Sequence, residues 1–375
     1  MRPHLRALAD ALDKRSTQGN LRSLRPLPPH GSLIDFYSND YLGVARLAPN
    51  FAETAYKNTH DLRGGSTGSR LLSGNFDAVT ALEQDLAAYF DAPAALVFNS
   101  GYTANIGFFQ AVPQRGDVIL YDALIHASVR EGVRLSRADS FSFAHNDVDD
   151  LAKKIQKYAP RNVFVAVESL YSMDGDFAPL RALADLCDRY EAALVIDEAH
   201  STGVFGNEKI GNGLCVQLGI QHSVFARLYT FGKAVGAHGA VWVGSELLQT
   251  FLVNFSRAFI YTTAPPPAQI ADIQYKINYI RTHGKPLQAQ LFKNIQAFLN
   301  NNKTDFDANT LFSPIQTVQI NDAAACKTVA QNLREKGLDV RAILAPTVAA
   351  GSERLRICIH AYNTAQEMEH LRKSI

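Results

Sequence analysis

The chain has few cysteines and almost no net charge. Its 375 residues include four cysteines, and 37 lysines and arginines nearly balance 36 aspartates and glutamates, for a formal net charge of +1. The near-neutral charge gives no reason to expect nucleic acid or an anionic membrane as a partner. Cys187, Cys215, Cys326 and Cys358 form no C-x-x-C pair, which favours free thiols in a reducing cytoplasm over a disulfide framework or a zinc site. We therefore expect no bound metal.

Long apolar runs are also missing. The first ten residues lack the apolar core of a signal peptide, and no run reaches the length that spans a membrane. Apolar residues still make up 47% of the chain, which is typical of a globular protein with an ample core. The length allows one large domain and a smaller one, and we expect the protein to be cytoplasmic.

Strand and helix patterns alternate from about residue 78 onward. Short apolar runs predict strands, and helical spacing of apolar residues between them predicts helices, as at 147–158 and 179–190. The predicted strands are 95–98, 117–120, 162–167 and 193–196. Strands in regular alternation with helices favour an α/β fold with a mainly parallel, doubly wound sheet.

The pattern changes after residue 243. Helical spacing predicts three helices, at 245–256, 266–282 and 286–300, and the remainder is typical of a small α+β domain. An amphipathic helix with Leu5, Leu8 and Leu12 on one face opens the chain. The predicted organisation is an N-terminal arm (1–45), a large domain (46–255), and linking helices followed by a small C-terminal domain (256–375).

The chemistry of the chain centres on one lysine and one aspartate. Asp197 ends the apolar run 193–196, so we expect it at the carboxyl edge of the sheet. Lys233 follows a second apolar run and is surrounded by small or apolar residues, an unusual setting for a solvated amine. A desolvated lysine loses its charge readily and can form an imine, as pyridoxal phosphate (PLP) chemistry requires. The Asp197 carboxylate could keep the pyridine nitrogen of PLP protonated.

Other candidates each have a plain structural alternative. The glycine turn at 99–105 joins a strand to a helix and could bind one phosphate, although such turns are common in α/β proteins. It lacks the G-x-G-x-x-G spacing of a dinucleotide site. His126 could stack on a planar ring or be a helix-start histidine with no ligand. His200 could hydrogen-bond the phenolic oxygen of the cofactor or satisfy loop backbone. Arg356 could hold a substrate carboxylate or form a structural ion pair.

Together these motifs resemble the α-oxoamine synthase family of fold-type-I PLP enzymes, in the same order and over nearly the whole chain. The matching runs are Ser38–Gly43, Gly65–Gly74, Ser100–Asn105, Asp122–Ser128, Glu168–Asp176, Asp197–Gly203 and Thr230–Lys233. The resemblance implies the fold of that family: a large PLP-binding α/β domain with a small C-terminal α+β domain.

The resemblance also implies residue roles. Lys233 would attach PLP and move protons at the substrate Cα. Asp197 would pair with the pyridine nitrogen, His126 would stack on the ring, and His200 would lie near the phenolic oxygen. The other implied cofactor contacts are Ser172, Gly101, Tyr102, Thr230 and, from the neighbouring subunit of a homodimer, Thr263. The implied substrate contacts are Asn39 and Arg356 for the amino-acid carboxylate, with Arg22 and Thr347 also on the substrate side.

Members of this family condense an amino acid with an acyl thioester and release carbon dioxide. The run Gly65–Gly74 is most similar to members that use L-alanine and a pimeloyl thioester, carried by CoA or by an acyl carrier protein, in biotin biosynthesis. One departure concerns the acyl side. Where those members usually read Arg-Pro-Pro-Thr-Val-Pro, residues 344–349 read Leu-Ala-Pro-Thr-Val-Ala.

Two alternatives stay open. The chain could be a sibling synthase with another amino acid or acyl thioester, such as one of the glycine C-acetyltransferase type. It could also be a silent PLP-binding subunit that stabilises an active partner, although Lys233 in its full motif argues against that.

Overall fold

The computed structural model describes residues 2–24, 26, 31–47, 64–299 and 312–375, which form two compact units. The larger unit comprises residues 39–172 and 176–291, and the smaller unit comprises residues 1–38, 173–175 and 292–375. The division differs from the expected one at both ends. The N-terminal segment belongs with the C-terminal residues, and 256–291 belong to the larger unit, because one long helix runs across the expected linker.

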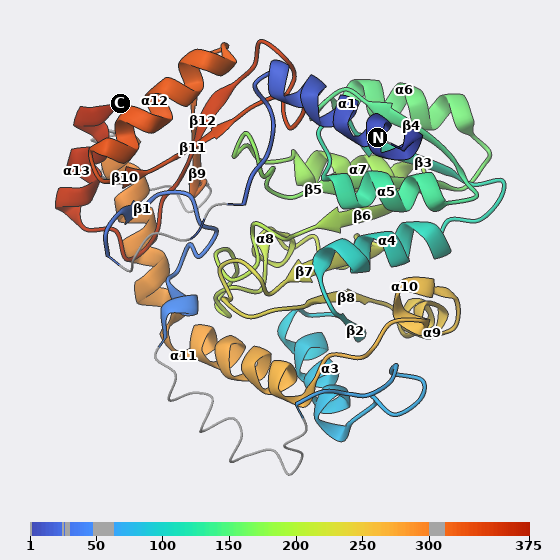
Figure 1. Ribbon diagram of the computed structural model, residues 1–375. Coiled ribbons are helices and arrows are strands. Elements are labelled where there is room, and N and C mark those ends of the chain that lie inside the picture. Colours follow the sequence, from blue (N-terminus) through green and yellow to red (C-terminus); the bar gives the residue numbers. More distant parts are fainter. Residues whose placement is uncertain (1, 25, 27–30, 48–63, 300–311) are drawn as a thin grey trace. The chain divides into compact units, whose positions relative to one another are not determined.

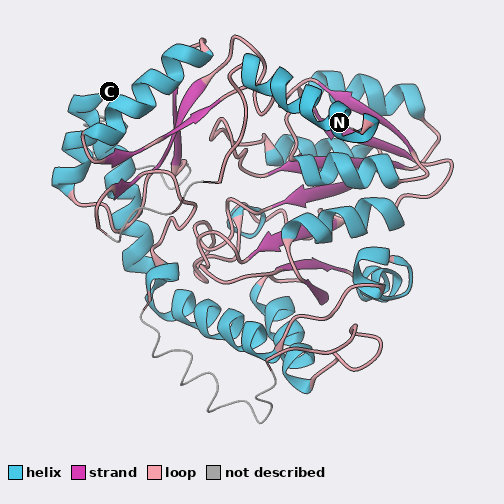
Figure 2. Cartoon of the chain, in the orientation of Figure 1, coloured by secondary structure: helices cyan, strands magenta, loops and turns pink. Residues whose placement is uncertain are grey.

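A seven-stranded sheet forms the centre of the larger unit, in the order β2-β8-β7-β6-β5-β3-β4 (Figures 1 and 2). Neighbours from β7 to β4 are parallel, whereas β8 is antiparallel to both β7 and β2. The strands are β2 (Ala94–Phe98), β3 (Val118–Asp122), β4 (Asp139–Phe143), β5 (Val163–Glu168), β6 (Ala193–Asp197), β7 (Ala226–Thr230) and β8 (Ala240–Gly244). The predicted α/β fold with a mainly parallel sheet is confirmed.

Helices of the larger unit follow the strands and bury apolar faces on the sheet. They are η1 (Val44–Arg46), α3 (Asp77–Tyr89), α4 (Gly101–Ala111), α5 (Ala127–Leu135), α6 (Val148–Tyr158), α7 (Leu180–Arg189), α8 (Leu214–Gln217), α9 (Glu246–Phe255) and α10 (Arg257–Ile260). One buried cluster joins Phe108 of α4 and Val129 of α5 to alternate residues of the strands, such as Leu96 and Phe98 of β2. Because alternate side chains of a strand point to the same face of the sheet, α4 and α5 cover that face.

Two predictions for this region were incomplete or wrong. Strands β4 and β8 were not predicted. In β4 only Phe143 of the five residues is buried, so the apolar signal is weak. The helices expected at 266–282 and 286–300 are one helix, α11 (Pro267–Leu299), with Pro286 inside it. A proline removes one backbone hydrogen bond. Ile280 and Leu291 are fully buried on either side of it, and this packing holds the helix together across the proline.

The smaller unit contains a three-stranded antiparallel sheet, β11-β12-β9, and a parallel pair, β1-β10. Its elements are α1 (Pro3–Thr17), β1 (Ile34–Asp35), β9 (Ile315–Gln319), α12 (Ala323–Glu335), β10 (Leu338–Asp339), β11 (Arg341–Ile343), β12 (Arg354–Cys358) and α13 (Ala365–Ser374). This is the predicted small α+β domain. The apolar face of α1 is exposed in the isolated chain, with Leu8 62% exposed.

No helix within the described residues combines the length and the apolar character that crossing a bilayer requires.

Candidate active site

A pocket of about 300 Å³ opens in the larger unit where the parallel strands end. Asp197 is the last residue of β6, and Lys233 lies three residues beyond the end of β7, so the register of two neighbouring parallel strands brings both to the same edge. Eight residues proposed from the sequence line this pocket: Asn39, Gly101, Tyr102, His126, Asp197, His200, Thr230 and Lys233.

The Asp197 carboxylate is buried and held by two donors. The Asn105 side-chain amide donates to its Oδ2 (2.8 Å), and the backbone N–H of Ala199 donates to its Oδ1 (2.9 Å). Asn105 also donates to the hydroxyl of Ser128 (2.9 Å), which links α4 to α5 behind the pocket. Two such bonds hold the carboxylate in a fixed orientation, as a partner of a protonated heterocycle must be held.

Glu168 places a second carboxyl group beside Asp197. The two residues end neighbouring strands and are opposite in register, and Glu168 is 3% exposed. Burial first, and then the charge of Asp197, raise the pKa of Glu168 to about 8. Glu168 is therefore mostly protonated at neutral pH. Its Oε1 has no hydrogen-bond partner among the described residues, which leaves one buried polar atom for a bound group.

His126 caps the first turn of α5 with its ring. The backbone N–H of Ser128 donates to His126 Nδ1 (3.2 Å), and the Ser128 hydroxyl lies 2.7 Å from the same nitrogen. Burial, reinforced by the positive charge of Lys233, lowers the pKa of His126 below its usual 6.5 despite the attraction of Asp197. The ring is therefore neutral at physiological pH, which suits stacking on another ring. The Tyr102 ring stands edge-on to it at 6.4 Å.

His200 is buried and shares a hydrogen bond with a tyrosine. The Tyr41 hydroxyl lies 2.7 Å from His200 Nδ1 and also donates to Asn39 Oδ1 (3.2 Å). This chain of contacts joins the loop after β6 to the segment 39–41 on the pocket wall. The orientation of the His200 ring is thus set from outside its own loop.

A glycine at the start of α4 lets this helix approach strand β7 closely at the edge of the pocket. Ser100 caps this helix, since its hydroxyl accepts from the backbone N–H of Thr103. A Cβ on Gly101 would lie 2.5 Å from Cγ2 of Thr230, so only glycine lets the helix start approach β7 this closely. The free N–H groups at this helix start and the Thr230 hydroxyl are suitable for a phosphate.

The remaining residues proposed from the sequence do not line this pocket. Ser172 lies in the hairpin after β5. Thr263 is exposed, and its carbonyl accepts from the side chain of Asn99 (2.9 Å). In the smaller unit, Arg356 is buried in β12 and one of its N–H groups contacts the Cys358 sulfur (2.9 Å).

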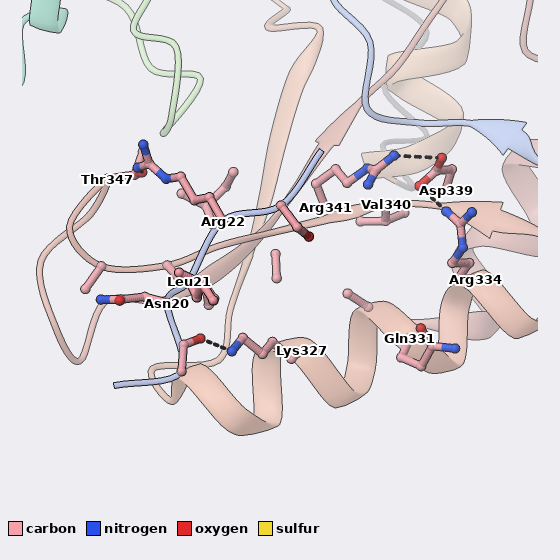
Figure 3. A pocket seen from close by; sticks show the side chains of 17 residues that line it. Asn20, Leu21, Arg22, Lys327, Gln331, Arg334, Asp339, Val340, Arg341 and Thr347 are labelled. Carbon is pink, nitrogen blue, oxygen red and sulfur yellow. Dashed lines mark hydrogen bonds and ion pairs between the residues drawn. The ribbon is translucent and has the colours of Figure 1, made fainter. Parts of the chain in front are cut away.

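Arg22 and Thr347 line a separate pocket of about 470 Å³ within the smaller unit (Figure 3). The Arg22 guanidinium donates to the Thr347 hydroxyl (3.4 Å). Three further cations line the pocket, and among the described residues the only carboxylate there is the buried Asp339. Those cations are Lys327, Arg334 and Arg341. Leu344 and Ala345, where the sequence departs from the family pattern, also line it.

Sequence reasoning missed Asn105, Ser128 and Glu168 as pocket residues. All three lie inside matching runs, but an amide, a hydroxyl and a strand-end acid are common in any α/β protein. Their role depends on spatial proximity, because Asn105 and Asp197 are 92 positions apart in the chain. Among the described residues, no group of three or more histidine, cysteine or acidic side chains could hold a metal ion.

Comparison with known proteins gives the family. Residues 32–375 match the model of aminotransferase class I and II. The chain belongs to this family. It is 37% identical to 8-amino-7-oxononanoate synthase of Emericella nidulans, over 98% of this chain and 94% of that protein. It is also 37% identical to 8-amino-7-oxononanoate synthase 2 of Bacillus subtilis, over 97% and 95%.

Solved structures of related enzymes have a similar fold. Serine palmitoyltransferase from S. paucimobilis with a bound PLP–myriocin aldimine has a TM-score of 0.87 at 26% identity, with 98% of this chain and 95% of that chain covered. 8-Amino-7-oxononanoate synthase from Francisella tularensis has a TM-score of 0.74 at 26% identity, with 92% and 96% covered. The resemblance to α-oxoamine synthases and the fold-type-I architecture predicted from the sequence are confirmed.

Proposed function

We propose that this protein is a PLP-dependent acyltransferase of the 8-amino-7-oxononanoate synthase type. It condenses L-alanine with a pimeloyl thioester, releases carbon dioxide and forms 8-amino-7-oxononanoate, a step of biotin biosynthesis. The observation that carries the proposal is one pocket lined by both Lys233 and Asp197. Relatives with this activity in their names align with nearly the whole chain.

The pocket residues fit PLP. Lys233 would attach the aldehyde, Asp197 would pair with the pyridine nitrogen, and the helix start at Gly101 would bind the phosphate, since all three residues line the pocket. His200 and Ser172 would hold the phenolic oxygen, and the neutral His126 ring would stack on the heterocycle. When bound, PLP supplies an electron sink for the electron pair left at the substrate Cα. Lys233 then takes the proton from the Cα of alanine and returns one to the product.

Lysine and aspartate contribute in different ways. Asp197 is buried. In such a setting, a carboxylate within hydrogen-bond distance of a pyridinium stabilises the protonated ring by several kcal/mol, which shifts the protonation equilibrium of the ring by about two or more powers of ten. Lys233 must lose its proton before its amine can attack the aldehyde. Lys233 and Asp197 would therefore act on different atoms of the cofactor.

We propose that Asn39 and Arg356 bind the alanine carboxylate, since a buried guanidinium is the natural partner of a carboxylate. Arg22 and Thr347 would bind the acyl donor, either acyl-CoA or an acyl carrier protein. The excess of cations in the pocket around Arg22 supports an anionic donor, because phosphopantetheine carries phosphate in both forms.

We also propose a cytoplasmic homodimer. The exposed Thr263 would contribute its hydroxyl to the phosphate of the neighbouring subunit, and the exposed apolar face of α1 supports contact with a second chain. All four cysteines are free and buried, which is typical of proteins in a reducing compartment.

The test is a spectral titration of the PLP-loaded protein with L-alanine and then with pimeloyl-CoA, followed by mass spectrometry of the product. We expect 8-amino-7-oxononanoate and carbon dioxide, and no product from the Lys233→Ala variant, which should also lack the absorbance of lysine-attached PLP. Absence of that band from the wild-type protein, or its persistence in Lys233→Ala, would exclude Lys233 as the attachment point.

A second candidate is a sibling synthase with another acyl thioester or amino acid. The loss of the family arginine at Leu344, together with the similarity to serine palmitoyltransferase structures, favours testing it. Parallel assays with glycine and serine, and with acyl-CoAs of several lengths, separate the two candidates. A silent PLP-binding subunit is disfavoured by Lys233, and turnover by the isolated protein would exclude it.

A further inference from the structure

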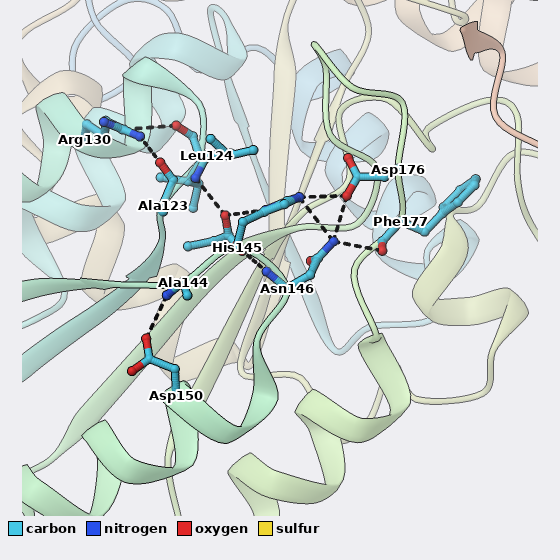
Figure 4. Close-up of polar contacts among 11 residues, drawn as sticks. Ala123, Leu124, Arg130, Ala144, His145, Asn146, Asp150, Asp176 and Phe177 are labelled. Carbon is cyan, nitrogen blue, oxygen red and sulfur yellow. Dashed lines mark hydrogen bonds and ion pairs between the residues drawn. The ribbon is translucent and has the colours of Figure 1, made fainter. Parts of the chain in front are cut away.

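A histidine outside the PLP pocket is held between two carboxylates (Figure 4). His145 follows strand β4. Its Nδ1 lies 2.8 Å from Oδ1 of Asp122, and its Nε2 lies 2.7 Å from Oδ2 of Asp176. An ionised carboxylate only accepts hydrogen bonds, and an imidazole donates from both nitrogens only when it carries a positive charge. Both ring nitrogens can donate to these carboxylates at once when His145 is an imidazolium; the Asn146 side-chain nitrogen also lies 3.3 Å from His145 Nε2.

The surroundings favour that charge. Burial opposes it, but the hydrogen bonds to Asp122 and Asp176 outweigh burial and raise the pKa of His145 from 6.5 to about 9. Burial likewise opposes ionisation of Asp122, yet its bond to His145 and two backbone N–H groups hold the pKa of Asp122 below its usual 3.8. At neutral pH a positively charged His145 therefore lies between the side chains of Asp122 and Asp176.

The charged and titratable groups around His145, Asp122 and Asp176 have other partners or are neutral. The Tyr171 ring stands edge-on to the imidazole at 4.5 Å, and burial raises the pKa of its phenol, which is neutral. Arg130 of α5 donates to the carbonyls of Ala123 and Ile125. Asp150 of α6 accepts from the backbone N–H of Ala144 and pairs with Lys154. Glu168, mostly protonated at neutral pH, adds little charge.

The two carboxylates belong to segments that present cofactor residues. Asp122 ends β3, and its Oδ1 also accepts from the backbone N–H of Leu124, inside the turn that leads to His126. The backbone carbonyl of Asp176 accepts from the N–H of Tyr171 (2.9 Å) and closes the hairpin that carries Ser172. His145 is thus the link between the turn before His126 and the hairpin of Ser172.

A neighbouring asparagine reinforces the same link. The Asn146 backbone N–H donates to Asp122 Oδ2 (2.9 Å), and its side-chain amide donates to Asp176 Oδ2 (2.7 Å) and to the carbonyl of Phe177 (3.2 Å). The left-handed backbone of Asn146, with φ of 56°, lets its backbone and side chain reach both segments at once. Neither His145 nor Asn146 lines the PLP pocket.

We propose that His145 is a positioning residue for the cofactor: as an imidazolium bound to Asp122 and Asp176, it fixes His126 and Ser172 in the places from which they contact PLP. The inference rests on the PLP-binding part of the proposed function and is independent of the acyl donor. Deprotonation of His145 breaks one of its two bonds and loosens the Ser172 hairpin relative to the His126 turn.

The test compares PLP binding by wild type, His145→Gln and the control His222→Gln at several pH values. His222 is an exposed histidine that contacts a single carboxylate, Asp91, at 3.4 Å. We expect His145→Gln to weaken PLP binding by about ten- to a hundredfold near neutral pH, the range known for residues that orient the direct ligands of a bound metal. The control should bind like wild type.

The pH dependence separates positioning from a general folding defect. The wild-type advantage over His145→Gln should shrink as pH rises through about 9, where the wild-type imidazolium loses its proton. NMR of the wild-type histidine rings gives a second readout that needs no variant. It should show one imidazolium protonated on both nitrogens that titrates near pH 9 and is absent from His145→Gln.

Equal PLP affinity of His145→Gln and wild type, a constant ratio of affinities across that pH range, or ordinary titration of His145 near 6.5 would each overturn this inference alone. Failure of the wild-type protein to bind PLP at all would overturn the proposed function as well.

Discussion

A methyl group at Gly101 should disturb the phosphate end of the pocket in a way that a second substitution repairs. A Cβ there would lie 2.5 Å from Cγ2 of Thr230, whereas carbon atoms in contact prefer about 3.5–4.0 Å. Either the start of α4 or the end of β7 must therefore move by about 1 Å. The next nearest atoms lie at 3.6 Å and beyond, so the strain of Gly101→Ala comes from that one methyl group.

The magnitude follows from two opposing terms. Overpacking costs about 1–3 kcal/mol. Replacing glycine with alanine at a helical position regains about 0.4–1 kcal/mol through the unfolded chain. We expect Gly101→Ala to lower the free energy of unfolding by about 1–2 kcal/mol and to weaken PLP binding, because the displaced N–H groups no longer point at the phosphate.

Thr230→Ser removes Cγ2 and keeps the hydroxyl, so it serves as the matched partner. Urea unfolding and PLP titration of both single variants and the double variant form a double-mutant cycle. The double variant should recover most of the stability and affinity lost in Gly101→Ala. The steric reasoning fails if Gly101→Ala behaves like wild type, or if Thr230→Ser brings no recovery.

Three further variants test the site and its support. Asp197→Asn should still bind PLP but lose orders of magnitude in kcat, since the neutral amide cannot keep the pyridine nitrogen protonated, and near-normal kcat would contradict this role. The pKa of Glu168 is raised from 4.5 to about 8, so its contribution to the free energy of unfolding is full below about 4.5 and is lost as pH rises through about 8. In urea unfolding without cofactor, Glu168→Gln should therefore be more stable than wild type above pH 8 and no more stable in acid. Arg70→Ala removes a bidentate partner of the buried Glu83 (2.8 and 2.9 Å) and should cost about 3–5 kcal/mol in unfolding free energy, with an exposed Arg134→Ala as the control that changes little.

Much of the fold could be predicted because its signals are local. The buried strands β2, β3, β5 and β6 are short apolar runs, and α6 and α7 repeat apolar residues at helical spacing. Strand β4 escaped prediction because an exposed edge strand needs few apolar residues. Pro286 was misjudged for the opposite reason, since buried neighbours hold α11 together where a local rule predicts a break.

The sequence also predicted several residues that share the pocket. Lys233, Asp197, His126 and Gly101 were proposed from their motifs, and all four line one pocket. What the motifs could not supply is which groups touch. Each lies on a different strand end or helix start, and only the register of the parallel strands brings them to one edge.

Proton positions were decided by tertiary structure alone. Glu168, an unremarkable strand-end acid in the sequence, keeps its proton because burial places it beside the charge of Asp197. His145 gains a proton because two carboxylates, 23 positions before it and 31 after it, converge on its ring. Charge state depends on distance and burial, which the order of residues along a chain does not specify.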